Sequence, residues 1–121
     1  MKDCVFCEIV NNEAPRTAVF ENEHVLAFAP LHPVVEGHTL VIPKAHYENI
    51  FDVDEKALTE VMLATKALSK TLAGQYGATG VNILNASGKD AQQSVFHIHF
   101  HIVPRHPDDG LDMWIKQGLA N

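Results

Sequence analysis

Residues 95–103 read VFHIHFHIV, and apolar residues alternate with histidines along this stretch. A period of two is that of a β-strand, in which residues i, i+2 and i+4 lie on one face. The apolar members are predicted to face a core beneath a helix, and they are Phe96, Ile98, Phe100 and Ile102. The histidines are predicted to form a row on the opposite face, with neighbours roughly 6.5–7 Å apart. This row consists of His97, His99 and His101.

The histidine stretch belongs to a predicted strand over residues 94–104, and four more strands are predicted upstream of it. Residues 17–21 and 24–28 are rich in strand-forming side chains, and the Asn-Glu pair between them suits a hairpin. Residues 39–43 (TLVIP) follow a Gly-His pair and close with a proline, which cannot donate to a sheet. Residues 80–85 (GVNILN) are the fourth predicted strand in chain order.

One long helix is predicted over residues 54–76, where the apolar period changes from that of a strand to that of a helix. Its apolar face comprises Leu58, Val61, Met62, Leu68, Leu72 and Tyr76. Asp52 and Glu55 have the spacing of a capping box, and Gly77 follows the last apolar position, where a left-handed residue is favoured. A short helix or turn is predicted around residues 3–11, and a polar loop over residues 86–93.

This order of elements predicts an α+β fold, with a five-stranded antiparallel sheet, one long helix and a short N-terminal helix. The 121 residues fit one domain, which we expect to span residues 1–121. Nine Lys and Arg against fifteen Asp and Glu give a formal net charge of -6, which disfavours nucleic acid as a partner. No apolar run is long enough for a membrane span or a signal peptide, so we expect a cytoplasmic protein without a membrane partner.

Three histidines in register favour a chemical site over a merely polar strand face. A neutral imidazole serves as a nucleophile, a base or a metal ligand near pH 7, because its ordinary pKa is about 6.5. The spacing alone does not choose among these roles. An attacking imidazole needs its second nitrogen to carry the proton and to donate it to an oriented acceptor, commonly a backbone carbonyl.

The two cysteines of the chain, Cys4 and Cys7, have Cys-x-x-Cys spacing and allow three interpretations. A redox pair is expected at the start of a helix that follows a strand, and only three residues precede Cys4. A structural disulfide is disfavoured by a reducing compartment and would close a very small loop. A zinc site is the third interpretation, for which two thiolates supply half of a four-coordinate set.

The histidine stretch resembles the His-φ-His-φ-His-φ-φ signature of the histidine-triad (HIT) family, where φ is an apolar residue. Four other stretches support the resemblance over nearly the whole chain: CVFCEIV at residues 4–10, VLAF at 25–28, EGHTLVIPK at 36–44 and NILN at 82–85. The resemblance implies an α+β homodimer that binds purine nucleotides. Members of the family hydrolyse nucleoside phosphoramidates or dinucleoside polyphosphates, or transfer nucleotidyl groups.

The resemblance also implies roles for individual residues. His99 would attack the α-phosphorus to form a nucleotidyl-histidine, and His101 would bind phosphoryl oxygens. The remaining positions around the phosphate and the leaving group are Asn85, Gln92, Gln93 and Ser94. For Asn85 a turn-forming role competes with phosphate contact, and for Ser94 a strand-start hydroxyl is the competing interpretation. The purine pocket maps onto Val5, Phe6, Ile9, Phe28 and Leu31, which core packing also explains.

One zinc-containing branch of the family, which includes bacterial and HINT-like members, joins the Cys-x-x-Cys pair to two histidines. The implied ligand set of a structural zinc is Cys4, Cys7, His46 and His97. His38 is within the Gly-His-Thr segment and is interpreted as a buried, hydrogen-bonded residue that could approach the triad. The other histidines are interpreted as surface or turn residues, and they are His24, His32 and His106.

Two departures from the family pattern concern the phosphate loop and the sugar. Gln92 stands where many members have glycine, and Pro30 stands where they commonly have aspartate. Neither position is the nucleophile, so we expect a nucleotidyl-histidine hydrolase or transferase without an organic cofactor. Three alternatives remain: a dinucleoside polyphosphate hydrolase, a metallohydrolase with a reactive zinc on the histidine row, and a zinc-stabilised nucleotide-binding partner protein with little catalysis.

Overall fold

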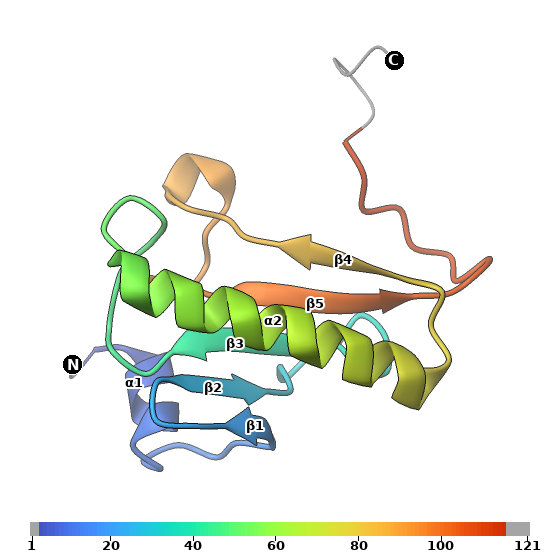
Figure 1. The fold of residues 1–121 in the computed structure, drawn as a ribbon. Coiled ribbons are helices and arrows are strands. Elements are labelled where there is room, and N and C mark those ends of the chain that lie inside the picture. Colours follow the sequence, from blue (N-terminus) through green and yellow to red (C-terminus); the bar gives the residue numbers. More distant parts are fainter. Residues whose placement is uncertain (1–2, 116–121) are drawn as a thin grey trace.

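The computed structural model describes residues 3–115 and contains one antiparallel sheet with a long helix across one face (Figure 1). The strands are β1 (Ala18–Glu21), β2 (Val25–Phe28), β3 (Thr39–Pro43), β4 (Gly80–Leu84) and β5 (Phe100–Arg105). The helices are α1 (Val5–Val10), α2 (Glu55–Tyr76) and the short 3-10 helix η1 (Lys89–Ala91). The α+β prediction with five antiparallel strands, one long helix and a short N-terminal helix is therefore confirmed.

The strands lie in the order β1-β2-β3-β5-β4, so the last strand of the chain is inserted between β3 and β4. The predicted hairpin joins β1 to β2, and its turn is held by the Asn22 carboxamide, whose Oδ1 accepts the amides of His24 and Val25, both at 2.9 Å. β5 pairs with β3 on one side and with the edge strand β4 on the other. His101 therefore lies inside the sheet, whereas His97 and His99 precede the strand.

The two faces of the sheet carry different cores, because successive side chains of a strand point to opposite sides. Figure 1 shows α2 lying across one face, whereas α1 lies at one end of the sheet. The core under α2 contains Val25, Ala27, Val41, Val61, Ala64, Leu68, Leu72, Ile98, Phe100 and Ile102. The core under α1 contains Cys4, Phe6, Cys7, Ile9, Leu26, Phe28, Leu40 and Ile42. Alternate residues of β2 and β3 pack into one core or the other, so both strands are buried along their whole length.

The last strand is shorter than predicted, because β5 begins at Phe100 rather than at residue 94. Its pairing with β3 ends at Val41↔Phe100 and its pairing with β4 ends at Leu84↔His101, so the preceding residues have no partner strand. A bend at residues 95–97 also turns Phe96 outward, where it is 45% exposed, so its predicted core position is wrong. Ile98 keeps its place in the core, and its amide donates to the Tyr47 carbonyl at 2.8 Å.

The long helix has the predicted length and apolar face, with Leu58, Met62 and Tyr76 packed against its buried residues. Its N-terminal cap is Asp54, whose carboxylate accepts the amides of Lys56 and Ala57. The prediction of Asp52 as the cap is wrong, because that carboxylate instead accepts the amides of Glu48 and Asn49 in the preceding turn. Gly77 ends the helix with φ +66, as predicted. Among the described residues, no helix is both long and apolar enough to cross a bilayer.

Candidate active site and metal centre

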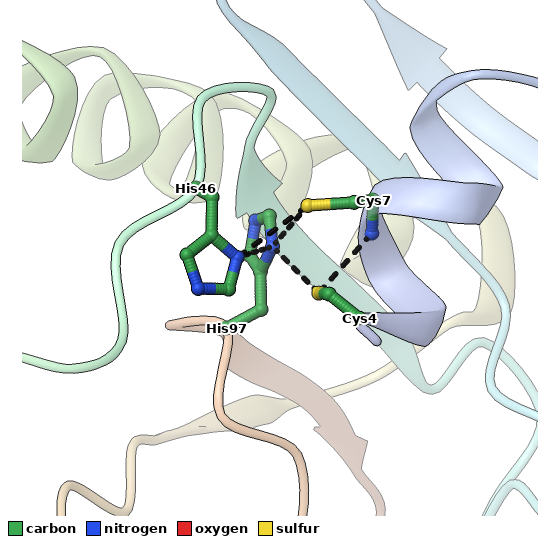
Figure 2. A group of neighbouring side chains, drawn as sticks. All are labelled: Cys4, Cys7, His46 and His97. Carbon is green, nitrogen blue, oxygen red and sulfur yellow. Dashed lines mark hydrogen bonds between the residues drawn. The ribbon is translucent and has the colours of Figure 1, made fainter. Parts of the chain in front are cut away.

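Four side chains from three distant segments converge beside the start of α1 (Figure 2). Cys4 and Cys7 come from the start of α1, His46 from the loop after β3, and His97 from the bend before β5. Their ligand atoms all lie within 4.8 Å of one another. The structure therefore brings together the whole predicted zinc set, although residues 4 and 97 are far apart in the chain.

The distances within this cluster fit a tetrahedral zinc ion. Zn–N bonds of about 2.0–2.1 Å and Zn–S bonds of about 2.3 Å place neighbouring ligand atoms roughly 3.3–3.8 Å apart. The two histidine Nδ1 atoms are separated by 3.2 Å, and Cys4 Sγ lies 3.3 Å from His97 Nδ1. Cys7 Sγ lies 3.4 Å from His46 Nδ1 and 3.6 Å from His97 Nδ1. Two sulfurs and two nitrogens form the four-ligand set of a structural zinc site.

The protein also orients these ligands for a cation. The Nε2–H group of His97 donates to the Pro43 carbonyl at 2.8 Å, which leaves the lone pair of Nδ1 for a metal. Burial lowers the pKa of His97 to about 4, so the ring is neutral at pH 7. Burial, together with the hydrogen bond and charge of Cys4, raises the pKa of Cys7 to about 11. A thiolate at Cys7 therefore needs a bound cation to compensate its charge.

His99 is buried between α1 and the sheet, at 5% exposure. Its Nδ1–H group donates to the carbonyl of His97 at 2.9 Å, which leaves Nε2 unprotonated when the ring is neutral. The ring edge of Phe6 packs at 5.2 Å between ring centroids, and the ring of His101 lies at the same centroid distance. Burial lowers the pKa of His99, which favours the neutral ring. The expected backbone acceptor is therefore present. His97 and His99 are buried against Phe6 of α1 rather than on a wetted face, and His101 is half-buried.

A chain of hydrogen bonds sets the proton positions of two more histidines. The amide of Val34 donates to His38 Nδ1 at 3.1 Å, and an amide can only donate, so the proton of neutral His38 lies on Nε2. That Nε2 lies 2.9 Å from His101 Nδ1, which must accept. The remaining proton of His101 is therefore on its own Nε2. Burial lowers the pKa of His38, and burial with the charges of His99 and His38 lowers that of His101 to about 4.

A cleft of about 390 Å³ opens beside His99 and His101. Its lining unites the predicted purine-pocket residues with three predicted catalytic residues, namely Val5, Phe6, Ile9, Phe28, Leu31, Ser94, His99 and His101. Leu31 is 93% exposed and stands at the rim, and Pro30 and His32 also line the cleft. The lining combines apolar side chains with histidines and a serine, so the cleft offers both apolar contact and imidazole nitrogens.

Three further predicted phosphate-site residues do not line this cleft. The Asn85 carboxamide donates to the His99 carbonyl at 3.0 Å and so fixes the backbone beside the nucleophile candidate. Gln93 is buried, and its amide group bonds Glu48, Val95 and Gly88 through their backbones. Gln92 is exposed and adopts φ +72, the left-handed conformation that favours glycine, which is the residue expected there from the family pattern.

The sequence signals did not reveal every group that shapes the site. The carbonyls of Pro43 and His97 and the amide of Val34 are backbone atoms, which have no residue signature. His38 is buried and hydrogen-bonded, as predicted, and it also approaches the triad, with its Nε2 2.9 Å from His101 Nδ1. The glycine at position 37 does indicate a close approach of the chain. Its φ is +89, and a Cβ on this residue would lie 2.8 Å from the Tyr76 ring.

Comparison with known proteins agrees with this geometry. The model of the HIT domain matches residues 11–108. An uncharacterized HIT-like protein of Borreliella burgdorferi is 45% identical over 91% of this chain and 81% of its own length. The adenosine 5'-monophosphoramidase HNT1 of Saccharomyces cerevisiae is 35% identical over 87% of this chain and 64% of its own length.

The solved structures include a zinc-bound histidine triad family protein from Mycobacterium smegmatis. It is 35% identical to this chain and superimposes with a TM-score of 0.88. The match covers 96% of this chain and 84% of the other protein. The family model spans most of the described residues, including both the metal cluster's histidines and the triad. The chain therefore belongs to the HIT domain family.

Proposed function

We propose that the protein is a hydrolase or transferase that acts at the α-phosphate of purine nucleoside phosphoramidates or related nucleotides. The observation that carries the proposal is the position of His99, a neutral imidazole whose Nδ1 proton is held by the His97 carbonyl in a cleft beside His101 and Ser94. Support also comes from the named phosphoramidase activity of the yeast relative.

In the first step the Nε2 lone pair of His99 attacks the α-phosphorus. The P–N bond to the leaving amine breaks, its electron pair stays on the amine nitrogen, and that nitrogen takes a proton. The His99 ring becomes a nucleotidyl-imidazolium, whose Nδ1–H bond to the His97 carbonyl strengthens as charge develops. The Asn85 carboxamide holds the His99 carbonyl and thus the backbone of the nucleophile.

In the second step a water oxygen attacks phosphorus, the P–Nε2 bond breaks and the water releases a proton. His99 then returns to its neutral form with the proton still on Nδ1. The Nε2–H group of His101 donates to a phosphoryl oxygen in both steps, because His38 has already oriented its other nitrogen. Ser94 lines the cleft, where its hydroxyl donates a hydrogen bond to the leaving nitrogen. The proton that this nitrogen takes comes from solvent, and the proton that the attacking water releases in the second step returns to solvent.

Zinc has a structural part in this proposal. When bound, it would neutralise the two thiolates of Cys4 and Cys7 and brace the bend that precedes His99. His97 is then committed to the metal and Pro43, and no step of the reaction passes through the ion.

The test is to trap the intermediate and remove its nucleophile. Hydrolysis of an adenosine phosphoramidate should be lost by several orders of magnitude in His99→Ala, as is usual when a covalent nucleophile is removed. Mass spectrometry of quenched wild-type enzyme should find a nucleotidyl group on His99, and His24→Ala should serve as a control with wild-type turnover. Activity of His99→Ala within about tenfold of wild type would refute the mechanism.

We further propose that the chain acts as a single domain over residues 1–121, in the cytoplasm and as a homodimer. Within the described sheet, β4 is an edge strand that pairs only with β5, and its Ile83 is 42% exposed. Such an edge is suited to pairing with a second copy. Light scattering that gives the mass of one chain would contradict the dimer.

A further inference from the structure

The backbone at His99 is held from outside the sheet. β5 begins at Phe100, so His99 precedes the ladder that fixes the rest of that strand. The amide of Ile98 donates instead to the Tyr47 carbonyl at 2.8 Å, and the carbonyl of His99 accepts from the Asn85 carboxamide at 3.0 Å. The position of the His99 backbone therefore depends on residues that follow β3 and β4.

The carboxamide of Asn85 is oriented by a relay of hydrogen bonds that starts in the loop after β3. The amide of Ile50 donates to Ser87 Oγ at 3.0 Å, and Ser87 Oγ donates to Asn85 Oδ1 at 2.8 Å. An amide can only donate, so the Ser87 hydroxyl accepts from Ile50 and gives its own proton to Asn85. With Oδ1 engaged, Asn85 Nδ2 faces the His99 carbonyl, which can only accept. The donor and the acceptor of each bond in the relay are therefore fixed.

The loop after β3 is itself held by its own hydrogen bonds. The Asp52 carboxylate accepts the amides of Glu48 and Asn49 at 3.1 Å and 2.8 Å. The carbonyl of Asn49 in turn accepts the amide of Val53 at 3.2 Å. The Ile50 amide that starts the relay therefore lies in a turn whose backbone is fixed on both sides.

A second side chain joins the loop after β3 to the loop that contains η1. The Gln93 carboxamide is buried and donates to the carbonyls of Glu48, at 2.6 Å, and Val95, at 3.0 Å. Its oxygen accepts the Gly88 amide at 2.7 Å. The two loops lie together at the end of the sheet where α2 begins (Figure 1). Gln93 thus holds them together, which keeps the two ends of the relay in contact.

We propose that Ser87 is a positioning residue for His99, which acts through Asn85. Ser87 is not among the residues that line the cleft, so its effect on the reaction passes through the backbone of the nucleophile. The inference rests on the proposed function, because it takes His99 as the nucleophile. Attack on phosphorus requires the nitrogen to be in line with the leaving group, and a small displacement of the nucleophile lowers the rate strongly. Without the Ser87 hydroxyl, the Asn85 carboxamide loses the bond that orients it toward the His99 carbonyl.

The experiment compares Ser87→Thr with Ser87→Val, two side chains of similar size that differ in the hydroxyl. Turnover of an adenosine phosphoramidate is measured with the zinc-loaded full chain. Ser87→Val should lower kcat by about five- to twentyfold with KM changed less than about twofold, whereas Ser87→Thr should stay within about twofold of wild type. Ser87→Ala lacks the hydroxyl without added bulk and should behave like Ser87→Val. Thr71→Val, the same exchange on the exposed face of α2, should leave turnover unchanged.

Two further measurements separate positioning from a general loss of structure. Amide hydrogen exchange at Ile50 should be faster in Ser87→Val than in wild type and unchanged in Ser87→Thr, because only valine leaves this amide without its acceptor. In the Asn85→Ala background, Ser87→Ala should lower kcat by less than about twofold further, because the relay no longer reaches His99.

Equal kcat in Ser87→Thr and Ser87→Val would overturn the inference, since the hydroxyl would then have no part in positioning. Wild-type kcat in Ser87→Ala would do the same. Losses that multiply in the Asn85→Ala, Ser87→Ala double variant would show that Ser87 does not act through Asn85. These three results leave the proposed function intact. The proposed function fails, and the inference with it, if wild-type turnover does not exceed that of His99→Ala.

Discussion

At the scale of single residues, one backbone amide determines how two histidines can act. Val34 N–H holds His38 Nδ1 as an acceptor, His38 Nε2–H then donates to His101, and His101 Nε2 keeps its proton. The directions of these hydrogen bonds cannot be reversed while both rings are neutral, because the Val34 amide cannot accept a hydrogen bond. In the proposed mechanism His38 is accordingly a positioning residue for His101.

Replacing His38 tests this positioning role. His38→Phe keeps a ring in the space but removes both hydrogen bonds, so kcat should fall by about ten- to a hundredfold with a smaller change in KM. His38→Gln should recover part of the loss, since a carboxamide can accept from Val34 and donate to His101. His24→Phe is the control for a histidine outside the cleft. An equal loss in His38→Gln and His38→Phe would show that His38 serves only packing.

Burial of His101 also predicts how stability depends on pH. Its folded-state pKa of about 4 lies below the unfolded value of about 6.5, so the unfolded chain binds more protons between these values. The free energy of unfolding should therefore fall as the pH is lowered from about 6.5 toward about 4, and this contribution is present in full above that window. In His101→Gln, urea denaturation should give a slope against pH that is smaller by up to about 1.4 kcal/mol per pH unit. Equal slopes of the free energy of unfolding against pH in the wild type and in His101→Gln would contradict a neutral, buried His101.

At the scale of elements, the start of α2 is fixed by one carboxylate. Asp54 accepts two amides of the first turn and also the Tyr47 hydroxyl at 3.2 Å, whereas Asp52 holds the turn before it. Both residues are aspartates close to the first apolar position of the helix. The sequence pattern alone therefore favours Asp52, which has capping-box spacing to Glu55. The choice between them depends on how the loop from β3 approaches the helix.

We expect Asp54→Ala to lower the free energy of unfolding by about 1 kcal/mol, the usual value for a lost N-cap. Glu55→Ala, one residue later, removes only a favourable charge in the first turn and should cost a few tenths of that amount. Urea denaturation of the zinc-loaded proteins measures both. A larger loss in Glu55→Ala than in Asp54→Ala would contradict the assigned cap.

At the scale of the whole molecule, the metal cluster joins three parts of the fold. Its ligands connect α1, the loop after β3 and the bend before β5, and Pro43, the last residue of β3, holds His97 through its carbonyl. Closing such long loops through one ion restricts the unfolded chain and couples metal binding to folding. His99 lies two residues after the ligand His97, so a bound zinc would also restrain the backbone at His99.

Removing zinc should therefore destabilise the whole domain rather than one loop. Protein purified without chelator should contain about one equivalent of zinc, and Cys4→Ser or His46→Ala should lose both the metal and several kcal/mol of stability. His32→Ala is the matched control, because this histidine is exposed and outside the cluster. Metal analysis with less than about a tenth of an equivalent in the wild type would refute a stably held zinc.

The sequence by itself determined the fold class and most of the element positions. Alternation along residues 95–103 identified the histidine row, the change of period identified α2, and Cys4 and Cys7 supplied half of a metal site. These signals are strong because side-chain periods of two and 3.6 follow from local backbone geometry. The other two zinc ligands came from the family resemblance, since no local pattern connects residue 46 or residue 97 with the cysteines.

Only the tertiary structure decided where β5 begins, which histidines are buried and which nitrogen of each ring is free. Phe96 turned outward and His99 turned under α1 because the segment before Phe100 has no partner strand and bends toward the metal cluster. The groups that orient His97, His99 and His38 are main-chain atoms of Pro43, His97 and Val34. Every residue carries such carbonyls, and all but proline carry such amides, so their placement leaves no mark in the sequence and depends on the folded chain.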